Sequence, residues 1–500
     1  MFRQRIVIMS IALLIVTVVP VSVSAQSPNA AKQLTDRILK MIEEVPDGGP
    51  TGEQVGWNWN WYLNQLMDQC RKTPTEEWLQ PTERILNTMF DKMSEGYDGY
   101  KGFVGPFIYN ENEYWCDVHV SDAILTGHAL TFAMIIHDRP ELQAQYGESC
   151  KRFIALARKD LIEKWDTRKT FVDDGPFGGY RDGTMYCKPG DMKNWFELDS
   201  ARTDNKAPSL PFNKSLDMAY CMLQLYYLTG ETPYKDQATK IYNRVKAGMN
   251  RFDGGYTWNY WEPVSPRDIL ETAPGRYDLT HWVGTHPYRD YQLGEVEKIL
   301  FAYDMGVTFT GDDMQRLVNT NLKFMWNGDL DDPQWANSDS KLPGYVKAAP
   351  STAYPTTAGT VWAPLARFDE TIAKLAKRSP SDSWERKHAP DAQVDDFPWM
   401  RGIGESGGQT EAIVIPSVVP PGESTMILSK AYSTERLPVE IYVRPIDGDT
   451  MTLLTTQSMG NSVQLFYSWD GKIDGRRTPG EYLIFWKYRN GERAYPVTLQ

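Results

Sequence analysis

The sequence predicts a mainly α-helical chain, an (α/α) toroid of helical hairpins, followed by a small C-terminal β-sandwich. With 500 residues the chain exceeds the usual size of one domain, so we expect at least two folded units. Apolar residues recur at helical spacing from about residue 31 to 376, whereas from residue 409 they alternate as in strands. The expected divisions are a signal peptide at 1–25, the toroid at 26–376, a linker at 377–408 and the sandwich at 409–500.

The composition is that of a globular protein with a surplus of aromatic residues. Hydrophobic residues make up 41% and aromatic residues 12%, with 17 Trp, 27 Tyr and 18 Phe. The formal net charge of −12 argues against a nucleic-acid partner, because phosphate backbones need a basic surface. Aromatic rings in this number either fill a helical core or stack on the faces of sugars.

The N-terminus has the layout of a cleavable secretory leader. Arg3 and Arg5 precede an apolar run at 6–19, and the small residue Ala25 comes just before Gln26. The run is shorter than the roughly 20 residues that span a bilayer. We therefore expect a secreted or periplasmic protein with no stable membrane insertion after cleavage.

Helical hairpins dominate the first 376 residues. In each pair the first helix is the more apolar, which predicts an inner ring of buried helices surrounded by amphipathic outer helices. Long loops then line one end of the ring, and such loops carry function more often than structure. The clearest pairs lie at 120–136 with 141–164, at 213–228 with 232–249, and at 291–305 with 310–324.

The C-terminal region contains a more specific motif. Trp-Asp-Gly at 469–471, Asp-Gly-Arg at 474–476 and Pro-Gly-Glu-Tyr at 479–482 resemble the terminal hairpin of the FlgD-like immunoglobulin-type module. The resemblance implies an accessory β-sandwich, so we expect no chemistry there.

The densest group of reactive side chains precedes a predicted inner helix. Two of the six histidines, His281 and His286, are followed by Tyr288, Arg289 and Tyr291. Tyr288, Tyr291 and Glu295 share one helix face by their spacing.

Two further segments are expected at the same end of the ring. Trp258, Tyr260 and Glu262 belong to an aromatic loop, and Asn213 with Lys214 begins another inner helix. The expected substrate-binding residues are Tyr260, Trp258, Glu262, Tyr291, Lys214 and His119.

These residue types suit β-elimination at a uronic acid. The sugar carboxylate is neutralised by Arg or Asn, a His or Tyr removes the α proton, and a Tyr returns a proton to the departing oxygen. This route requires no metal, and we predict neither a metal nor a cofactor. The expected partner is an acidic polysaccharide.

The helical region resembles the toroidal polysaccharide lyases, which include the alginate and glucuronan lyases. The resemblance rests on a helical pair at 213–249, a Tyr-x-Trp-x-Tyr loop at 256–260 and the His-rich segment at 281–291. It implies that His281 or His286 acts as base or neutraliser and Tyr288, less favourably Tyr291, as acid. It also implies that Arg289 and Asn213 bind the carboxylate.

Two alternatives remain open beside the predicted polysaccharide lyase. A glycoside hydrolase on the same scaffold needs two carboxyl groups that flank the bond. Its candidates are Asp173, Asp174, Asp253, Glu262 and Asp278. The third possibility is a non-catalytic glycan-binding protein, which would use the aromatic loops alone and need no cluster of His and Tyr.

Overall fold

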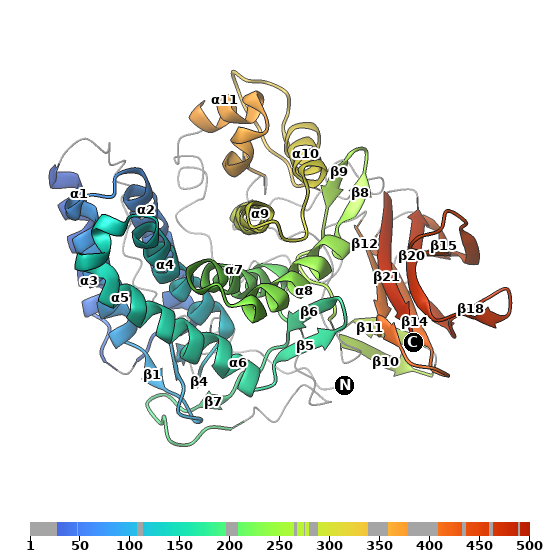
Figure 1. The fold of residues 1–500 in the computed structure, drawn as a ribbon, viewed down its shortest axis with the longest axis horizontal. Coiled ribbons are helices and arrows are strands. Elements are labelled where there is room, and N and C mark those ends of the chain that lie inside the picture. The colour runs from blue at the N-terminus through green and yellow to red at the C-terminus, as the bar shows by residue number, and fades with distance from the viewer. Residues whose placement is uncertain are drawn as a thin grey trace, which may run out of the picture.

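A computed structural model places helices in the first part of the chain and strands in the last (Figure 1). The described residues are 28–47, 49–107, 114–196, 209–264, 268–274, 276–279, 289–338, 359–378, 409–432, 437–459, 464–488 and 491–500. The predicted order, a ring of helices followed by a β-rich region, is confirmed in outline. The leader at 1–25 and most of the linker, from 379 to 408, lie outside the described residues.

Four helices line the inside of the ring and pack against one another in sequence order. They are α2 (Gly52–Lys72), α4 (His119–His137), α7 (Phe212–Thr229) and α9 (Arg289–Asp304). Helix α4 is apolar on nearly every side and almost all of its side chains are buried, as an inner helix requires. It is long and apolar enough to cross a bilayer, but its burial within the protein identifies it as a core helix.

Outer helices cover the inner ones. They are α1 (Pro28–Glu43), α3 (Glu76–Asp91), α5 (Gln143–Leu156), α8 (Thr232–Gly248), α10 (Gly311–Asn319) and α11 (Glu370–Arg378). Helix α5 continues through a π-helical segment, Ala157–Glu163, into α6 (Lys164–Thr167). Helix α10 begins with a capping box, in which Thr310 and Asp313 each bond the other's backbone N–H.

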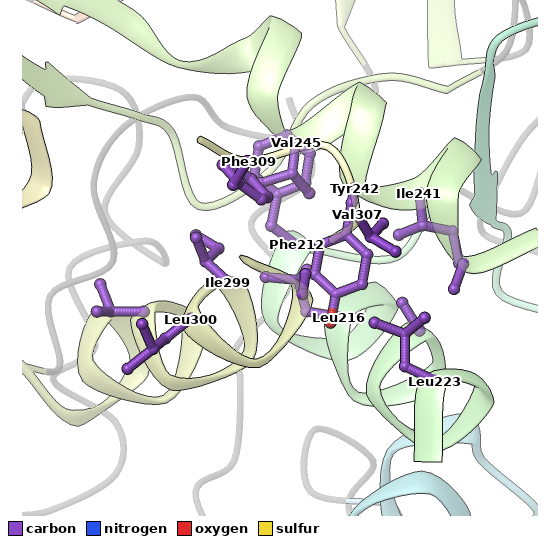
Figure 2. Packing of buried hydrophobic residues seen from close by; sticks show 14 of the residues in the cluster. Phe212, Leu216, Leu223, Ile241, Tyr242, Val245, Ile299, Leu300, Val307 and Phe309 are labelled. Atoms are coloured by element: carbon purple, nitrogen blue, oxygen red, sulfur yellow. The ribbon is translucent and has the colours of Figure 1, made fainter. Parts of the chain in front are cut away.

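The core between the two layers is apolar. Figure 2 shows side chains of α7, α8 and α9 meeting there, together with two residues that precede α10. On α8 the buried positions follow helical spacing, at Ala238, Ile241, Tyr242 and Val245. Long-range packing therefore fixes how the inner helices sit, and with them the residues at their ends.

Short strands connect the helices. They form the pairs β1 (Ser94–Glu95) with β2 (Lys101–Gly102), β5 (Phe171–Asp174) with β6 (Phe177–Tyr180), and β10 (Ile269–Ala273) with β11 (Arg276–Leu279). A three-stranded sheet joins β3 (Gly105–Pro106), β4 (Trp115–Cys116) and β7 (Tyr186–Cys187). These strands hold the loops at the ends of the inner helices.

The C-terminal region contains two antiparallel sheets. The smaller sheet has the order β12 (Gln409–Ile415), β14 (Thr425–Tyr432), β17 (Gln464–Trp469). The larger begins with β16 (Thr452–Met459), β15 (Leu437–Pro445), β20 (Gly480–Tyr488) and β21 (Gly491–Leu499). A short strand, β13 (Val418–Val419), pairs in parallel with β21, and β18 (Lys472–Ile473) forms a hairpin with β19 (Arg476–Arg477).

The larger sheet continues into the helical region, which the sequence pattern did not predict. Strand β21 pairs with β8 (Asn250–Phe252), which forms a hairpin with β9 (Gly255–Thr257). The helical region therefore contributes two strands to the C-terminal sheet. The two regions share one continuous hydrogen-bonded structure.

Buried ion pairs reinforce this junction, which we call the seam: Asp174, Arg244, Asn250, Glu262, Tyr488, Arg493 and Tyr495. Arg493 donates to Glu262 at 2.7 Å, and the side chains of both are almost completely buried. Arg244 donates to Asp174 at 3.1 Å and to the hydroxyl of Tyr495 at 2.6 Å. The seam therefore ties the ring to the C-terminal sheets through charges removed from water.

Candidate active site

The inner helices begin at one end of the ring. The hydroxyl of Ser121 donates to the carbonyl of Gly52 at 2.9 Å, which joins the starts of α4 and α2. The rings of Trp57 and Tyr291 lie 5.3 Å apart, which brings the starts of α2 and α9 together. We call this end the mouth: residues 52–57, 119–122, 212–217 and 289–295, with the loop 258–262.

A glycine allows two of these helices to meet closely. A Cβ atom at Gly56 would lie 2.6 Å from the hydroxyl oxygen of Ser121, closer than two such atoms can approach. Helix N-termini carry partial positive charge, so their convergence favours acidic groups at the mouth. Glu53 and Asp122 occupy the first turns of α2 and α4.

Glu53 is a buried carboxylate held by two donors. The Lys214 ammonium lies 2.9 Å from its Oε1, and the indole nitrogen of Trp57 donates to the same oxygen at 3.3 Å. The second oxygen, Oε2, has no hydrogen-bond partner among the described residues. Glu53 therefore combines an ion-paired oxygen with one whose hydrogen-bonding capacity is unused.

Glu295 is a second buried carboxyl group, one turn beyond Tyr291 on α9. Its Oε2 accepts a hydrogen bond of 2.6 Å from the indole nitrogen of Trp258. Burial raises the pKa of Glu295 to about 8, and the nearby carboxylate of Asp217 adds to the rise. Within the described part of the chain, Oε1 of Glu295 has no partner. Glu295 is therefore a neutral acid at pH 7.

Two buried amides at the mouth also have unused polar atoms. Asn213, in the first turn of α7, has neither its oxygen nor its nitrogen bonded within the described ranges. Gln292 donates from its nitrogen to Ser338 at 2.8 Å, but its oxygen accepts nothing from the residues described. Buried polar atoms are normally paired, and within the described residues α2, α7 and α9 each carry at least one without a partner at the mouth.

A pocket lies beside these groups. Its empty space, part of which is open solvent, is about 250 Å³. The lining combines an ammonium, a carboxylate, a hydroxyl and an aromatic ring with apolar side chains. The lining residues are Phe107, Val118, His119, Val120, Asp182, Thr184, Leu210 and Lys214.

His119 lines this pocket but is a poor base. Its ring stacks on Trp165 with a centroid distance of 3.5 Å, and its Nε2 lies 3.2 Å from the hydroxyl of Thr170. That hydroxyl donates to the carbonyl of Trp165, so Nε2 of His119 carries the proton. Burial, with Arg168 and Lys164 nearby, holds the pKa of His119 well below its usual range. His119 is therefore a neutral ring suited to hydrogen bonding.

Half-buried aromatic rings surround the mouth. Tyr260 lies edge-on to Tyr291 at 6.5 Å, and its carbonyl accepts from the first residue of α7, Phe212, at 3.0 Å. Tyr114, Tyr186 and Phe196 form a second group, which packs with Trp57 and Phe107 around an apolar cluster. Rings of this kind provide flat surfaces for sugar faces.

Two residues that were expected to bind substrate are instead structural. Trp258 packs its ring against Trp362 in the core and donates to Glu295 through its indole nitrogen, so its ring face is not free to stack on a sugar. Glu262 is enclosed at the seam with Arg493. Burial raises the pKa of Glu262, which the Arg493 guanidinium opposes. Sequence spacing alone did not distinguish these residues from Tyr260, which lies between them.

The other predicted carboxyl groups do not form a pair at the mouth. Asp173 is exposed and ion-paired with Lys240, and Asp174 belongs to the seam. Asp253 lies in the turn between β8 and β9. Asp278 lies on β11, but its side chain is not described.

The predicted His and Tyr cluster cannot be placed. His281, His286 and Tyr288 lie outside the described residues. Arg289 is the first residue of α9, without a described side chain. Their catalytic roles stay predictions that the structure does not address.

The comparisons found no matching family model and no matching curated protein. Among solved structures, a GH76 α-mannanase from Bacteroides thetaiotaomicron matches with a TM-score of 0.33 and 12% identity, over 53% of this chain and 56% of that one. This chain thus spans little more than half the length of that mannanase. An inactive GH76 α-1,6-mannanase variant from Salegentibacter, in complex with α-1,6-mannotriose, matches with a TM-score of 0.34 and 14% identity, over 70% and 82%. A β-glucosidase from Listeria innocua matches with a TM-score of 0.15 and 15% identity, over 24% and 20%.

The prediction of a polysaccharide lyase is corrected. Against the predicted lyase class stand the two GH76 matches, which are glycoside hydrolases. The candidates for base and acid, His281, His286 and Tyr288, lie outside the described residues, whereas Asn213 lies at the mouth. The prediction that the polysaccharide is acidic depended on β-elimination at a uronic acid, so it loses its basis together with the lyase class.

Proposed function

We propose that the protein is a glycoside hydrolase that cleaves a polysaccharide at the mouth. The observation that carries the proposal is a pair of buried carboxyl groups in different charge states. Glu295 has a pKa of about 8 and is protonated at pH 7, whereas Glu53 is ion-paired with Lys214. Glycosidic hydrolysis needs this division, because one carboxyl group donates a proton while the other acts as a base or nucleophile.

Glu295 is assigned as the general acid. Its protonated carboxyl group would donate to the departing glycosidic oxygen, leaving a carboxylate that Lys298, a positive neighbour on α9, helps to stabilise. Its unpaired Oε1 is the atom available for this transfer.

Glu53 is assigned to the opposite role. Its ion-paired carboxylate would stabilise the positive charge that develops on the sugar, and then either attack the anomeric carbon or activate a water molecule. Lys214 and Trp57 orient the group through Oε1, which leaves Oε2 for the reaction. Asn213 supplies an amide for sugar hydroxyls, and Tyr260 and Tyr291 supply the stacking surfaces.

The test follows product chemistry on a panel of polysaccharides. The full chain is incubated with α-1,6-mannan, glucomannan, xylan and alginate, and both reducing ends and ultraviolet absorbance are recorded. We expect reducing ends without the absorbance of an unsaturated sugar, and a rate that falls as the pH rises through about 8, where Glu295 loses its proton. Absorbing products, or no turnover on any polymer, would refute the proposal.

Variants assign the two carboxyl groups. Glu295→Gln and Glu53→Gln should each lower the rate roughly 100- to 10,000-fold. Asp173→Asn is the matched control, because it removes an acid that is exposed and lies outside the mouth. Asp182→Asn tests the carboxylate that lines the pocket. If that variant is inactive while Glu53→Gln is active, the role given to Glu53 is wrong.

A further inference from the structure

A pair of aromatic rings, one exposed and one half-buried, lies outside the mouth. Tyr97, between β1 and β2, is 43% exposed, although large aromatic side chains are usually more buried. Its ring centre lies 5.8 Å from that of Trp195, and the two planes are inclined by 54°. The indole nitrogen of Trp195 donates to the carbonyl of Met192 at 2.8 Å, which fixes its orientation.

A buried cation holds Tyr97 in place. The guanidinium of Arg168 lies 4.9 Å from the Tyr97 ring centre, although its side chain is only 4% exposed. Asp98 receives two hydrogen bonds from this guanidinium, at 2.7 and 3.0 Å, and Asp117 receives one at 2.9 Å. Arg168 is therefore fixed on both sides, and an exposed ring above a fixed cation loses little entropy on binding.

A continuous stack connects this surface to the pocket. Beneath Tyr97, the Arg168 guanidinium also lies 4.6 Å from the ring centre of Trp165. The other neighbour of Trp165 is the stacked ring of His119, which lines the pocket at the mouth. The order from surface to pocket is therefore Tyr97, Arg168, Trp165, His119.

The second ring of the pair also adjoins the mouth. Phe196 follows Trp195 directly, and its backbone pairs with that of Tyr186. Tyr186 and Phe196 belong to the aromatic group that packs with Trp57, the residue that donates to Glu53. Consecutive contacts through this group therefore link Trp57 at the mouth to Phe196, the neighbour of Trp195.

We propose that Tyr97 and Trp195 form a distal subsite that binds a sugar unit of the same polysaccharide, away from the bond being cleaved. This inference rests on the proposed function. The apolar face of a sugar ring stacks on the exposed ring of Tyr97 beside the half-buried Trp195, and Arg168 holds Tyr97 in place. The occupant is a polysaccharide chain, because only a chain of several units connects this surface to the mouth.

The test measures glycan binding without turnover. Tyr97→Ala and Trp195→Ala are made in the Glu295→Gln chain and run in native gels that contain α-1,6-mannan, glucomannan, xylan or alginate. Each variant should weaken retardation by the retained polymer roughly tenfold, the effect of losing one ring contact. Tyr227→Ala is the control, because Tyr227 is 38% exposed and lies at the opposite end of the ring, 5.6 Å from His137.

The outcomes separate this inference from the proposed hydrolysis. Weaker retardation for both variants, with the Tyr227→Ala chain unchanged, supports the subsite even if the polymer is never hydrolysed. Equal retardation of all chains overturns the subsite while leaving hydrolysis intact, and so does an equal loss in the control. If no polymer retards the parent chain, the subsite is also refuted. Thermal unfolding of each variant confirms that a loss of binding does not reflect unfolding.

Discussion

The mouth and the seam both bury polar side chains, but they treat them differently. At the seam each buried carboxylate faces a guanidinium, as Glu262 faces Arg493 and Asp174 faces Arg244. At the mouth, Asn213 and Glu295 keep polar atoms that have no partner among the described residues. Each such atom costs about 1–3 kcal/mol. The two regions therefore differ in their carboxyl groups: guanidinium groups neutralise both buried carboxylates of the seam, whereas Oε1 of Glu295 has no partner among the described residues. Buried atoms without a described partner occur in both regions, since Nε of Arg244 is another.

The largest effect on stability is expected at the seam. Arg493→Met leaves Glu262 as an uncompensated buried charge and should lower the free energy of unfolding by about 3–5 kcal/mol. Urea unfolding at pH 7 measures this. Lys151→Met, which breaks an exposed pair with Glu148, is the control and should leave the free energy of unfolding nearly unchanged. If both substitutions lowered the free energy of unfolding by the same amount, the expected difference between a buried ion pair and a surface ion pair would be wrong.

A smaller, pH-dependent effect is expected at the mouth. Glu295 binds its proton more tightly in the folded chain, where the pKa is about 8, than in the unfolded chain, where it is about 4.5. Between pH 4.5 and pH 8 the folded state holds a proton that the unfolded state has lost. The free energy of unfolding therefore falls as the pH rises, by about 1.4 kcal/mol per pH unit. Urea unfolding at pH 5 and pH 8 should show a loss of a few kcal/mol that Glu295→Gln reduces. Identical pH profiles for the two chains would exclude a raised pKa.

The smallest change in stability is expected when either of two buried amides, Asn213 or Asn250, is replaced. Asn213→Leu removes atoms that have no described partner and should stabilise the chain by about 1 kcal/mol while weakening glycan binding. Asn250→Leu at the seam removes the acceptor of the Tyr488 hydroxyl, bonded at 2.9 Å, and should destabilise by a similar amount. Thermal unfolding shows whether each variant is more or less stable than the parent chain. A loss of stability in both variants would mean that the two regions do not differ in this respect.

Local sequence patterns predicted the helices well. The pair expected at 213–228 and 232–249 is found as Phe212–Thr229 and Thr232–Gly248. Gly230 adopts the left-handed conformation that ends the first helix, and Pro233 lies in the first turn of the second. These signals depend on neighbouring residues, so they can be recognised without knowledge of the fold.

The candidate site was harder to predict, because its chemistry depends on burial. The chain has 65 acidic residues, and nothing adjacent in sequence marks Glu53 or Glu295. Glu295 shares a helix face with Tyr291, which was noticed, but its raised pKa comes from enclosure by α7 and the Trp258 loop. Trp258 and Glu262 were misassigned for the same reason. The sequence indicates which residues lie near the mouth. It does not reveal which of their side chains point into the mouth.

The pairing of β8 with β21 has a consequence for how the chain is completed. Arg251 pairs with Glu492, so a hairpin made midway through the chain is joined by its last strand. Until β21 has been synthesised, the edge of that hairpin exposes unpaired backbone groups that can pair with other strands. A fragment that ends before β21 would keep this strand edge unpaired. Pairing with β21 thus covers part of the edge of a hairpin that is synthesised much earlier.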